Sequence, residues 1–321
     1  MKCTVFVDWL TFSVKGIQPS DVIRRFLGLD PALFQDPGYG LMGYAQSLKF
    51  NDIFVLYQPR ENDYFCDMGV CVSMSGNGCR IFEKMTSLSG SASAFPALFK
   101  RLAAEETCSV SRLDIACDDR DGVLNMDTML EKVQRNEVNS RMSKRSVVVS
   151  YDGARKNGAT CYIGAPTSDF RVRIYDKALE QGIEGHWLRV EMVMRHENAK
   201  AFVLSLSVGE AVGTLASKVL NDKLSFIEID DSNISRCSVC DWWRNFVDEL
   251  EAVRLVSREV IQHAVEHVEE WVEWQVGPSL ALLLETLGWS RIFELAVDAR
   301  ERLSDRQRAL IRDYNRLSPA L

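Results

Sequence analysis

The 321-residue sequence predicts an α+β fold, in which a largely antiparallel central sheet with flanking helices is followed by a C-terminal helical region. Two observations lead to this prediction. Up to about residue 235, short segments that alternate apolar and polar residues are separated by clusters of Gly, Asn and Asp, a pattern typical of strands and turns. From Val239 to Asn315 the apolar residues follow a helical period instead. We therefore expect one domain over residues 1–235 and a second, helical domain over residues 236–321.

The first domain is expected to mix strands and helices along the chain. Strand character marks Thr4–Val14, Ser47–Tyr57, Tyr64–Ser75, Ser111–Asp118, Ser146–Tyr151, Thr160–Gly164, Phe170–Tyr175 and Trp187–Met194. Helices are predicted over Pro19–Leu27, Ala94–Ala104, Met126–Arg135 and Glu197–Ser205. Turns are predicted at Asp36–Gly38, Gly76–Gly78, Asp152–Gly153 and Asn157–Gly158.

Composition narrows the class of protein. With 46% hydrophobic and 26% charged residues the chain is typical of a globular protein, and its net charge of −7 argues against a surface that is basic throughout. A local basic groove for nucleic acid remains compatible with this charge. The nine cysteines are scattered, the N-terminus has no secretory leader pattern, and no apolar run is long enough to span a membrane. We expect a soluble, reduced, cytoplasmic protein without membrane association.

Two five-residue segments resemble each other, Arg80–Lys84 (RIFEK) and Arg173–Lys177 (RIYDK). Each follows a strand and turn that contain Cys and Gly, and each lies downstream of another expected strand. A duplicated half-domain would explain the similarity, with Phe82 in the first copy where the second copy has Tyr175.

Three of the expected strands alternate charged and apolar residues, and one of them contains a tyrosine. Their sequences are SRLDIACD, FRVRIYDK and LRVEMVMR, at residues 111–118, 170–177 and 188–195. Because successive side chains of a strand point to opposite faces, each segment has one apolar and one polar face. The polar faces carry Arg112, Asp114, Ala116 and Asp118, then Arg171, Arg173, Tyr175 and Lys177, then Arg189, Glu191, Val193 and Arg195. If these strands are neighbours, one sheet face holds a tyrosine, carboxylates and guanidiniums.

This set of side chains suits phosphodiester chemistry. A tyrosine can attack phosphorus, carboxylates can hold a divalent metal, and arginines can neutralise a phosphate. A free phenol has a pKa of about 10, and Arg173 and Lys177 each lie about 7 Å along the strand from Tyr175. Either could lower the pKa of the tyrosine or bind the phosphate. Carboxylate ligands favour Mg²⁺ or Mn²⁺ over zinc.

Simpler interpretations exist for the same charged residues. Asp114 and Glu191 could form salt bridges with Arg112 and Arg189 on the sheet surface. Arg112 could orient a carboxylate or contact DNA.

A basic cluster flanks the expected strand around Val147–Val149. It consists of Arg141, Lys144, Arg145, Arg155 and Lys156. Such a cluster contacts a DNA backbone or forms a solvated basic loop, and the sequence leaves both open. The competing tyrosines, Tyr151 and Tyr162, have apolar or small neighbours in their strands, so we predict that they are packing residues.

Seven short motifs together resemble a known family, the replication initiation factors of rolling-circle plasmids, filamentous phages and conjugative elements (the Rep_trans type). They occur in the family's order and cover roughly residues 4–200. The motifs are Val7–Phe12, Gly38–Gly40, Ser75–Cys79, Ser111–Ala116 with Asp118 and Asp119, Thr160–Gly164, Arg173–Lys177 and Arg189–Glu191. The C-terminal 80 or so residues lie outside the resemblance, apart from the Trp242–Trp243 pair.

The resemblance implies a site- and strand-specific DNA nickase that depends on Mg²⁺ or Mn²⁺. A tyrosine attacks one phosphodiester at the replication origin and stays joined to the 5′ phosphate, and the released 3′ hydroxyl primes synthesis by the host polymerase. The nucleophile corresponds to Tyr175. The acidic metal-binding positions correspond to Asp114 and Glu191, with Asp118 as a further one, and the basic positions to Arg173, Lys177 and Arg189. The polar run that often follows the Tyr-Ile-Gly motif is Ala165–Thr167 here, which puts any phosphate contact there in doubt.

Two rival functions stay open at this point. The first is a non-catalytic protein that binds and melts origin DNA and recruits a host helicase, which would need no metal-binding carboxylates opposite a tyrosine. The second is a conjugative relaxase, which uses the same chemistry. The Trp-rich C-terminal helices would form a small core, or contact origin DNA, a helicase or the second subunit of a homodimer.

Overall fold

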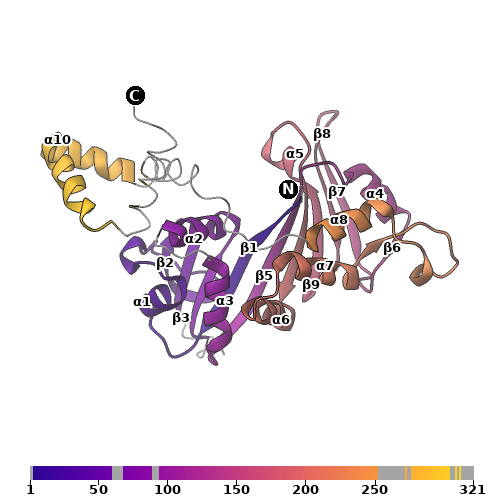
Figure 1. Cartoon of the computed structure of the whole chain (residues 1–321), viewed down its shortest axis with the longest axis horizontal. Helices are drawn as coiled ribbons and strands as arrows, with labels where there is room; N and C mark the ends of the chain where they lie inside the picture. The colour runs from indigo at the N-terminus through magenta and orange to yellow at the C-terminus, as the bar shows by residue number, and fades with distance from the viewer. Residues whose placement is uncertain are drawn as a thin grey trace. The chain divides into compact units, whose positions relative to one another are not determined.

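The computed structural model describes residues 3–59, 68–88, 94–251, 272, 276–303, 308 and 311. The chain divides into two compact units, one of Met1–Phe82 with Phe95–Leu255 and one of Glu83–Ala94 with Val256–Leu321. The larger unit contains the sheet and most of the helices (Figure 1). None of the described helices has the length and apolar character needed to cross a membrane.

The described part of the larger unit is built on a nine-stranded sheet in which every neighbouring pair is antiparallel. The strand order is β2-β3-β4-β1-β5-β10-β9-β8-β7. The strands are β1 (Cys3–Val14), β2 (Tyr44–Phe50), β3 (Ile53–Pro59), β4 (Val70–Met74), β5 (Cys108–Asp119), β7 (Arg145–Asp152), β8 (Arg155–Ile163), β9 (Phe170–Asp176) and β10 (Leu188–Arg195). The predicted α+β class with a largely antiparallel sheet is confirmed.

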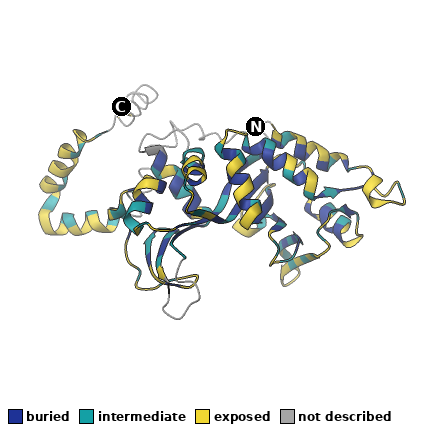
Figure 2. Cartoon of the chain, turned by 90° about the horizontal axis from the view of Figure 1, so that it is seen from below, coloured by how far each residue is buried: buried dark blue, intermediate teal, exposed yellow. Residues whose placement is uncertain are grey.

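One face of this sheet is apolar and lies under helices. These are α6 (His196–Ser207), α7 (Val212–Lys223) and α8 (Asp241–Glu251), which pack on β1, β5 and β10 with their buried sides inward (Figure 2). The core between them includes Leu113, Ile115 and Trp243, all completely buried. Trp243 stacks edge-on against Phe226 of the short strand β11 (Ser225–Phe226), which pairs with β6 (Val138–Asn139). The opposite, polar face therefore has to carry the charged residues of the three alternating strands.

Smaller helices pack around the remaining strands. Phe12 of β1 contacts Phe26, which lies in the turn Ile23–Leu27 that continues α1 (Pro19–Val22). The other helices are α2 (Gly76–Leu88), of which residues 76–82 belong to the larger unit, α3 (Ala94–Ala104), α4 (Met126–Gln134) and α5 (Lys177–Gln181), with short 3₁₀ turns at Pro31–Leu33 and Ile234–Arg236.

The sheet consists of two halves with the same topology. In the first half the spatial order is β2-β3-β4-β1, and in the second it is β8-β9-β10-β5, with β7 added at the edge. A helix follows β4 and another follows β10, and the halves join along β1 and β5. This arrangement agrees with a duplicated half-domain. The two similar five-residue segments, however, do not occupy equivalent places in the two halves, so this part of the prediction was wrong. Arg80–Lys84 lies on α2, whereas Arg173–Lys177 spans the end of β9 and the start of α5.

Several local predictions differ from the structure. Ser47–Tyr57 is a hairpin with its turn at Asn51 and Asp52 rather than one strand, and Gly76–Gly78 begins α2 rather than a turn. Helix α7 was not predicted. Residues 64–67 of one predicted strand and 252–271 of the predicted helical region lie outside the described residues.

The C-terminal region contains α8 and α10 (Gly277–Arg300), and α10 is interrupted at Gly288, whose φ of 75° is left-handed. Helix α8 belongs to the larger compact unit, which extends to Leu255. A functional division at residues 235/236 stays a prediction.

Candidate active site on the polar face of the sheet

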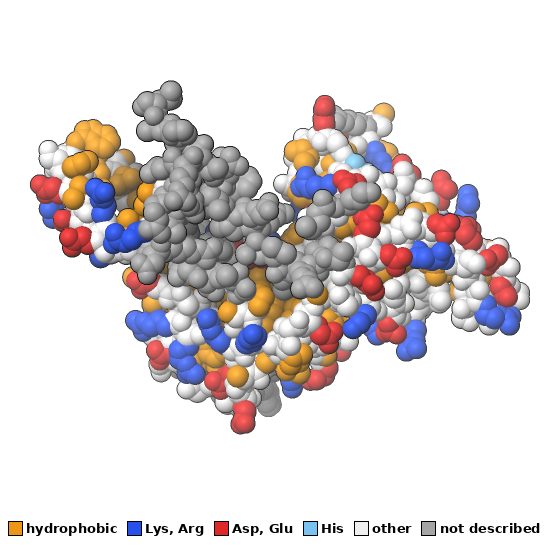
Figure 3. All heavy atoms as spheres, viewed as in Figure 1, with side chains coloured by type: hydrophobic (Ala, Val, Ile, Leu, Met, Phe, Trp, Pro, Cys, Tyr) orange, Lys and Arg blue, Asp and Glu red, His pale blue; other side chains and the backbone are white. Residues whose placement is uncertain are grey.

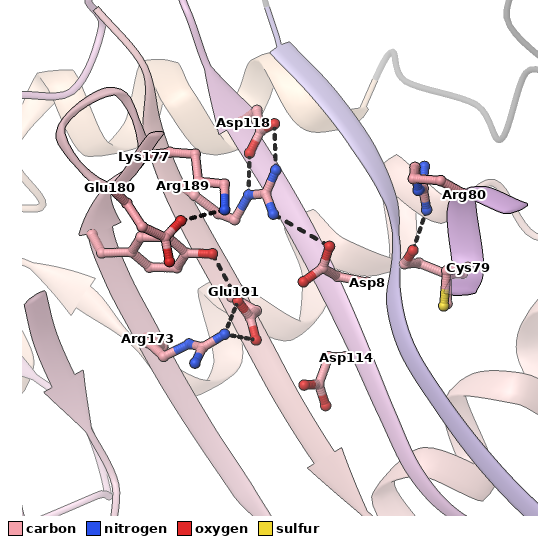
Figure 4. A network of polar contacts seen from close by, with 12 residues as sticks. Asp8, Cys79, Arg80, Asp114, Asp118, Arg173, Lys177, Glu180, Arg189 and Glu191 are labelled. Carbon is pink, nitrogen blue, oxygen red and sulfur yellow. Dashed lines mark hydrogen bonds and ion pairs between the residues drawn. The ribbon is translucent and has the colours of Figure 1, made fainter. Parts of the chain in front are cut away.

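Cross-strand pairing arranges the polar residues of β5, β10 and β9 in rows. Asp118, Arg189 and Tyr175 are paired in one row, and Ala116, Glu191 and Arg173 form the next. The third row consists of Asp114, Val193 and Arg171. The three alternating segments are therefore neighbours, and their polar residues face one another on one side of the sheet (Figure 4).

Tyr175 is almost completely buried, with 7% of its surface exposed. Its hydroxyl donates a hydrogen bond to Oε2 of Glu191 at 3.3 Å. The guanidinium of Arg173 lies 5.2 Å from the centre of its ring and the ammonium of Lys177 lies 5.7 Å from it. Burial raises the pKa of the phenol, the charge of Glu191 raises it further, and Arg189 and Arg173 offset only part of this effect. Of the two roles considered for these basic neighbours, lowering the pKa of Tyr175 or binding the phosphate, the first does not prevail in this structure, and the phenol is a protonated donor.

Glu191 is fully buried and receives two donors at once. Arg173 Nη2 lies 2.6 Å from Oε1 and 2.5 Å from Oε2 of this carboxylate. The Nε atom of Arg173 is buried without a hydrogen-bond partner among the described residues. Glu191 therefore links the arginine and the tyrosine that occupy alternate positions of β9.

Arg189 is held between two carboxylates. Its Nε and Nη2 atoms donate to Asp118 at 2.6 and 3.0 Å, and its Nη1 atom lies 3.2 Å from Oδ1 of Asp8 (Figure 4). Both Arg189 and Asp118 are buried. Both oxygens of Asp118 therefore accept hydrogen bonds from Arg189.

Asp8 belongs to the site although the sequence analysis did not select it. Val7 pairs with Ile115 and Trp9 with Asp114, so Asp8 is the extra residue of a β-bulge. The bulge turns Asp8 toward Arg189, and burial, with the charge of Glu191, raises the pKa of its carboxyl group. In the sequence the apolar alternation continues from Val7 to Trp9, so the bulge becomes visible only from the burial, in which Leu10 rather than Trp9 is the next buried residue after Val7.

Asp114 lies in the third row and is bound by Arg112. Arg112 Nε and Nη2 donate to its two oxygens at 2.9 and 2.6 Å, and the same guanidinium stacks on the ring of Trp9 at 4.1 Å. Burial raises the pKa of Asp114 to about 7; Arg112 opposes this shift, and Glu191 adds to it. Of the two roles considered for Arg112, it orients a carboxylate in this structure.

The carboxylates of the site can be compared with the ligand sets that hold divalent metal ions in proteins. The described residues contain no group of three or more His, Cys, Asp or Glu side chains placed to hold a metal ion. Mg²⁺, however, is usually bound by one or two carboxylates together with substrate phosphates and water, not by an all-protein cage. Asp114 and Glu191 supply carboxylate oxygens, the donor type that such a cation takes, and each carboxylate accepts hydrogen bonds from an arginine in this structure.

The remaining predicted basic residues lie in different environments. Lys177 is the first residue of α5 and pairs with Glu180. Arg145 bonds to Asn136 and to the Val138 carbonyl, and Lys156 pairs with Asp127 at 2.6 Å. Arg141 and Lys144 are exposed, and the side chain of Arg155 lies outside the described part of the structure.

The packing role predicted for the two competing tyrosines is wrong for Tyr151, which is 63% exposed at the end of β7. Tyr162 is half-buried and pairs with Arg173 on the polar face, where its ring contacts the guanidinium of Arg171. On the helix-covered face, acidic and basic side chains are interspersed over the described atoms (Figure 3). The charged cluster of the site lies on the opposite, polar face, because its residues alternate along β5, β10 and β9 with the buried apolar ones.

Comparison with known proteins identifies the family. A family model described as "Replication initiation factor" matches residues 108–299, and a second, "Rolling Circle replication initiation protein N-terminal domain", matches residues 4–101. The two matches meet where the two half-sheets join, between α3 and β5.

Two relatives match over most of the chain. A protein of Bacillus subtilis (strain 168) named "Putative DNA relaxase NicK" is 24% identical over 96% of this chain and 89% of its own length. The solved structure of a rolling-circle replication initiator protein from Geobacillus stearothermophilus is 29% identical and has a TM-score of 0.71, covering 79% of this chain and 99% of that one. Because the first family model spans more than half of the sequence, the chain belongs to the replication initiation factor family.

Proposed function

We propose that this rolling-circle replication initiator nicks one strand of its origin with Tyr175 and stays joined to the 5′ phosphate through that residue. One observation carries this proposal: the Tyr175 hydroxyl is bonded to Glu191 in a buried cluster with Arg173 and Arg189. A tyrosine packed for stability alone would not require two guanidiniums and a carboxylate around its hydroxyl.

In the proposed step, Tyr175 Oη attacks phosphorus and the bond to the 3′ oxygen breaks. The phenol proton passes to Glu191 Oε2, the atom to which it is already hydrogen-bonded. The departing 3′ oxygen takes a proton from water, so the result is a phosphotyrosine and a free 3′ hydroxyl, and the reverse reaction rejoins the strand.

The arginines have separate roles in this proposal. Arg173 exchanges its bond to Glu191 for the scissile phosphate, which frees the carboxylate to take the proton. Arg189 contributes a fixed positive charge, because Asp118 and Asp8 hold its guanidinium on two sides. We therefore assign Asp118 to positioning Arg189 rather than to binding a metal. Lys177, next to the ring of Tyr175, adds to the positive potential.

Asp114 and Glu191 would hold Mg²⁺ or Mn²⁺, which would neutralise charge on the phosphate. Arg112 would keep the Asp114 carboxylate oriented toward that position. The exposed Arg141 and Lys144 would contact the DNA backbone away from the nick.

The decisive experiment compares wild type with Tyr175→Phe on single-stranded oligonucleotides tiled across the origin, in Mn²⁺ or in EDTA. A covalent protein–DNA adduct on a denaturing gel should form only with wild type in Mn²⁺. Tyr151→Phe and Tyr162→Phe are the matched controls and should form the adduct. An adduct that survives Tyr175→Phe would reject this nucleophile, and origin binding without any adduct would favour the non-catalytic initiator.

A conjugative relaxase is the second candidate, because a relative that matches 96% of this chain is named a putative DNA relaxase. Both functions predict the same adduct. They differ in whether a plasmid carrying the origin is replicated or is transferred between cells. For either function, we propose that the protein also contacts a host helicase, a polymerase or a second copy of the chain.

A further inference from the structure

Arg171 is a cation without an anion on the polar face of the sheet. Among the described residues it forms neither a hydrogen bond nor an ion pair, and its buried Nε atom has no partner. By contrast, Arg112, Arg173 and Arg189 are each paired with a carboxylate. Burial lowers the pKa of Arg171, and the nearby charges of Arg173 and Arg195 add to this shift, while Tyr162 and Glu191 oppose it. The guanidinium of Arg171 is therefore available to bind a phosphate group of a ligand.

Tyr162 provides an aromatic surface at the same place. Its ring contacts the guanidinium of Arg171, 4.1 Å from the ring centre, and its side chain is half-buried. Tyr162 on β8 pairs with Arg173 on β9, so it lies one strand away from the strand that carries Tyr175. Arg171 and Tyr175 are four residues apart on one face of β9, which is about 13 Å along the strand.

We propose that Arg171 and Tyr162 form a subsite for a nucleotide that neighbours the scissile phosphate, in which Arg171 binds the backbone phosphate and Tyr162 stacks on the base. The inference rests on the proposed nicking function for its choice of ligand, single-stranded DNA. Stacking on an aromatic ring combined with a guanidinium is how single strands are commonly held, and it tolerates any base. The subsite would fix the path of the strand so that the phosphate next along it meets Tyr175.

The test measures equilibrium binding without cleavage, using an oligothymidylate of about 20 nucleotides in EDTA and fluorescence anisotropy at several salt concentrations. Tyr162→Leu should weaken binding by roughly 5- to 150-fold and leave the salt dependence unchanged, because only stacking is lost. Tyr162→Phe keeps the ring and should bind like wild type. Arg171→Gln should weaken binding and reduce the slope of log K against log salt by about 0.7, the value for one phosphate of a single strand.

Arg24→Gln, in the turn Ile23–Leu27 after α1, is the control for removal of one surface charge, since Arg24 lies away from the sheet and has its own partner, Asp21. A second measurement needs no substitution that could disturb folding. Wild type is cross-linked to the same oligonucleotide containing 5-iodouracil, and the cross-linked peptide should contain Tyr162. Equal losses in Tyr162→Leu and Tyr162→Phe would overturn stacking, and so would cross-links that exclude Tyr162. An unchanged salt slope in Arg171→Gln would overturn the phosphate contact.

These results are independent of the nicking assay. Normal adduct formation together with wild-type binding by Tyr162→Leu and Arg171→Gln would reject the subsite and leave the proposed function intact. Weaker binding by Tyr162→Leu, together with the absence of any adduct in the nicking assay, would support the subsite and reject the proposed nicking function.

Discussion

Arg189 of β10 reaches across β5 to Asp8 of β1, with 3.2 Å between Nη1 of the arginine and Oδ1 of the aspartate. Arg189 pairs with Asp118, while Asp8 is inserted between the partners of Ile115 and Asp114. Ala116 occupies the position of β5 between Asp114 and Asp118 on the polar face and is fully buried. The ion pair of Arg189 and Asp8 thus links the two halves of the sheet, because β10 belongs to one half and β1 to the other.

We expect Ala116→Leu to break this contact. Ala116 is fully buried on the polar face, so a larger side chain must displace Arg189 or Asp8. Overpacking of this kind costs about 1–3 kcal/mol in the free energy of unfolding, and adduct formation should fall with it. Chemical denaturation and the adduct assay measure the two effects, with Ala116→Gly as the control that keeps the space open. Wild-type adduct formation by Ala116→Leu would show that the contact is not needed.

The ion pair of Asp118 and Arg189 should show strong coupling. Asp118→Asn alone leaves the buried guanidinium with Asp8 as its remaining carboxylate partner, and loss of one member of a buried pair costs about 3–5 kcal/mol. Removing both charges with Arg189→Gln in addition should cost less than the sum of the single changes. A double-mutant cycle by urea denaturation measures this coupling. Additive losses would mean that the two side chains do not stabilise each other.

The sequence predicted the fold class and the polar face because both depend on local periodicity. Alternation in the three strands is read directly from the chain, and it put Tyr175, Arg173 and Glu191 on a single face if the strands were neighbours. Their order in the sheet depends on long-range pairing, which no local pattern specifies. Gly76–Gly78 illustrates a local failure, because glycines that usually mark a turn here begin a helix.

The electrostatics of the site were harder to predict. Basic neighbours at alternate positions suggested a lowered pKa for Tyr175, but burial and Glu191 dominate in the folded chain. Burial is a property of the whole assembly of strands and cannot be read from one of them. Asp8 was missed for a related reason, since a bulge is recognised only when both paired strands are known.

Asp114 should make stability depend on pH. Its pKa is about 7 in the folded chain against an ordinary value of 3.8, so between these values the folded state holds a proton that the unfolded chain has lost. The stability contributed by this group is therefore fully present below about pH 4 and is lost as the pH rises through 7. Asp114→Asn should flatten this decline, measured by urea denaturation from pH 5 to 8. A wild-type slope in the variant would assign the effect to another group.

The same carboxylate offers a metal test that does not need activity. Above pH 7 the charged forms of Asp114 and Glu191 repel each other, and a divalent cation should relieve this repulsion. Mg²⁺ or Mn²⁺ should raise the thermal midpoint of wild type more than that of Asp114→Asn, while NaCl at equal ionic strength should act equally on both. Asp127→Asn, an exposed carboxylate on α4, is the matched control. Equal responses in wild type and Asp114→Asn would remove Asp114 as a ligand.

Adduct formation itself should accelerate with pH well beyond neutrality. Burial and Glu191 raise the pKa of Tyr175 above its ordinary value near 10, so the reactive phenolate is scarce at pH 7 and each rise in pH increases it. Single-turnover rates with saturating DNA and Mn²⁺ should still be rising at pH 9, and a plateau near pH 7 would contradict the raised pKa. Glu191→Gln separates the two effects of its carboxylate. If Glu191 accepts the phenol proton, the variant should be slower by about 10²–10⁴-fold at neutral pH, whereas a faster variant would mean that the charge of Glu191 only opposes phenolate formation.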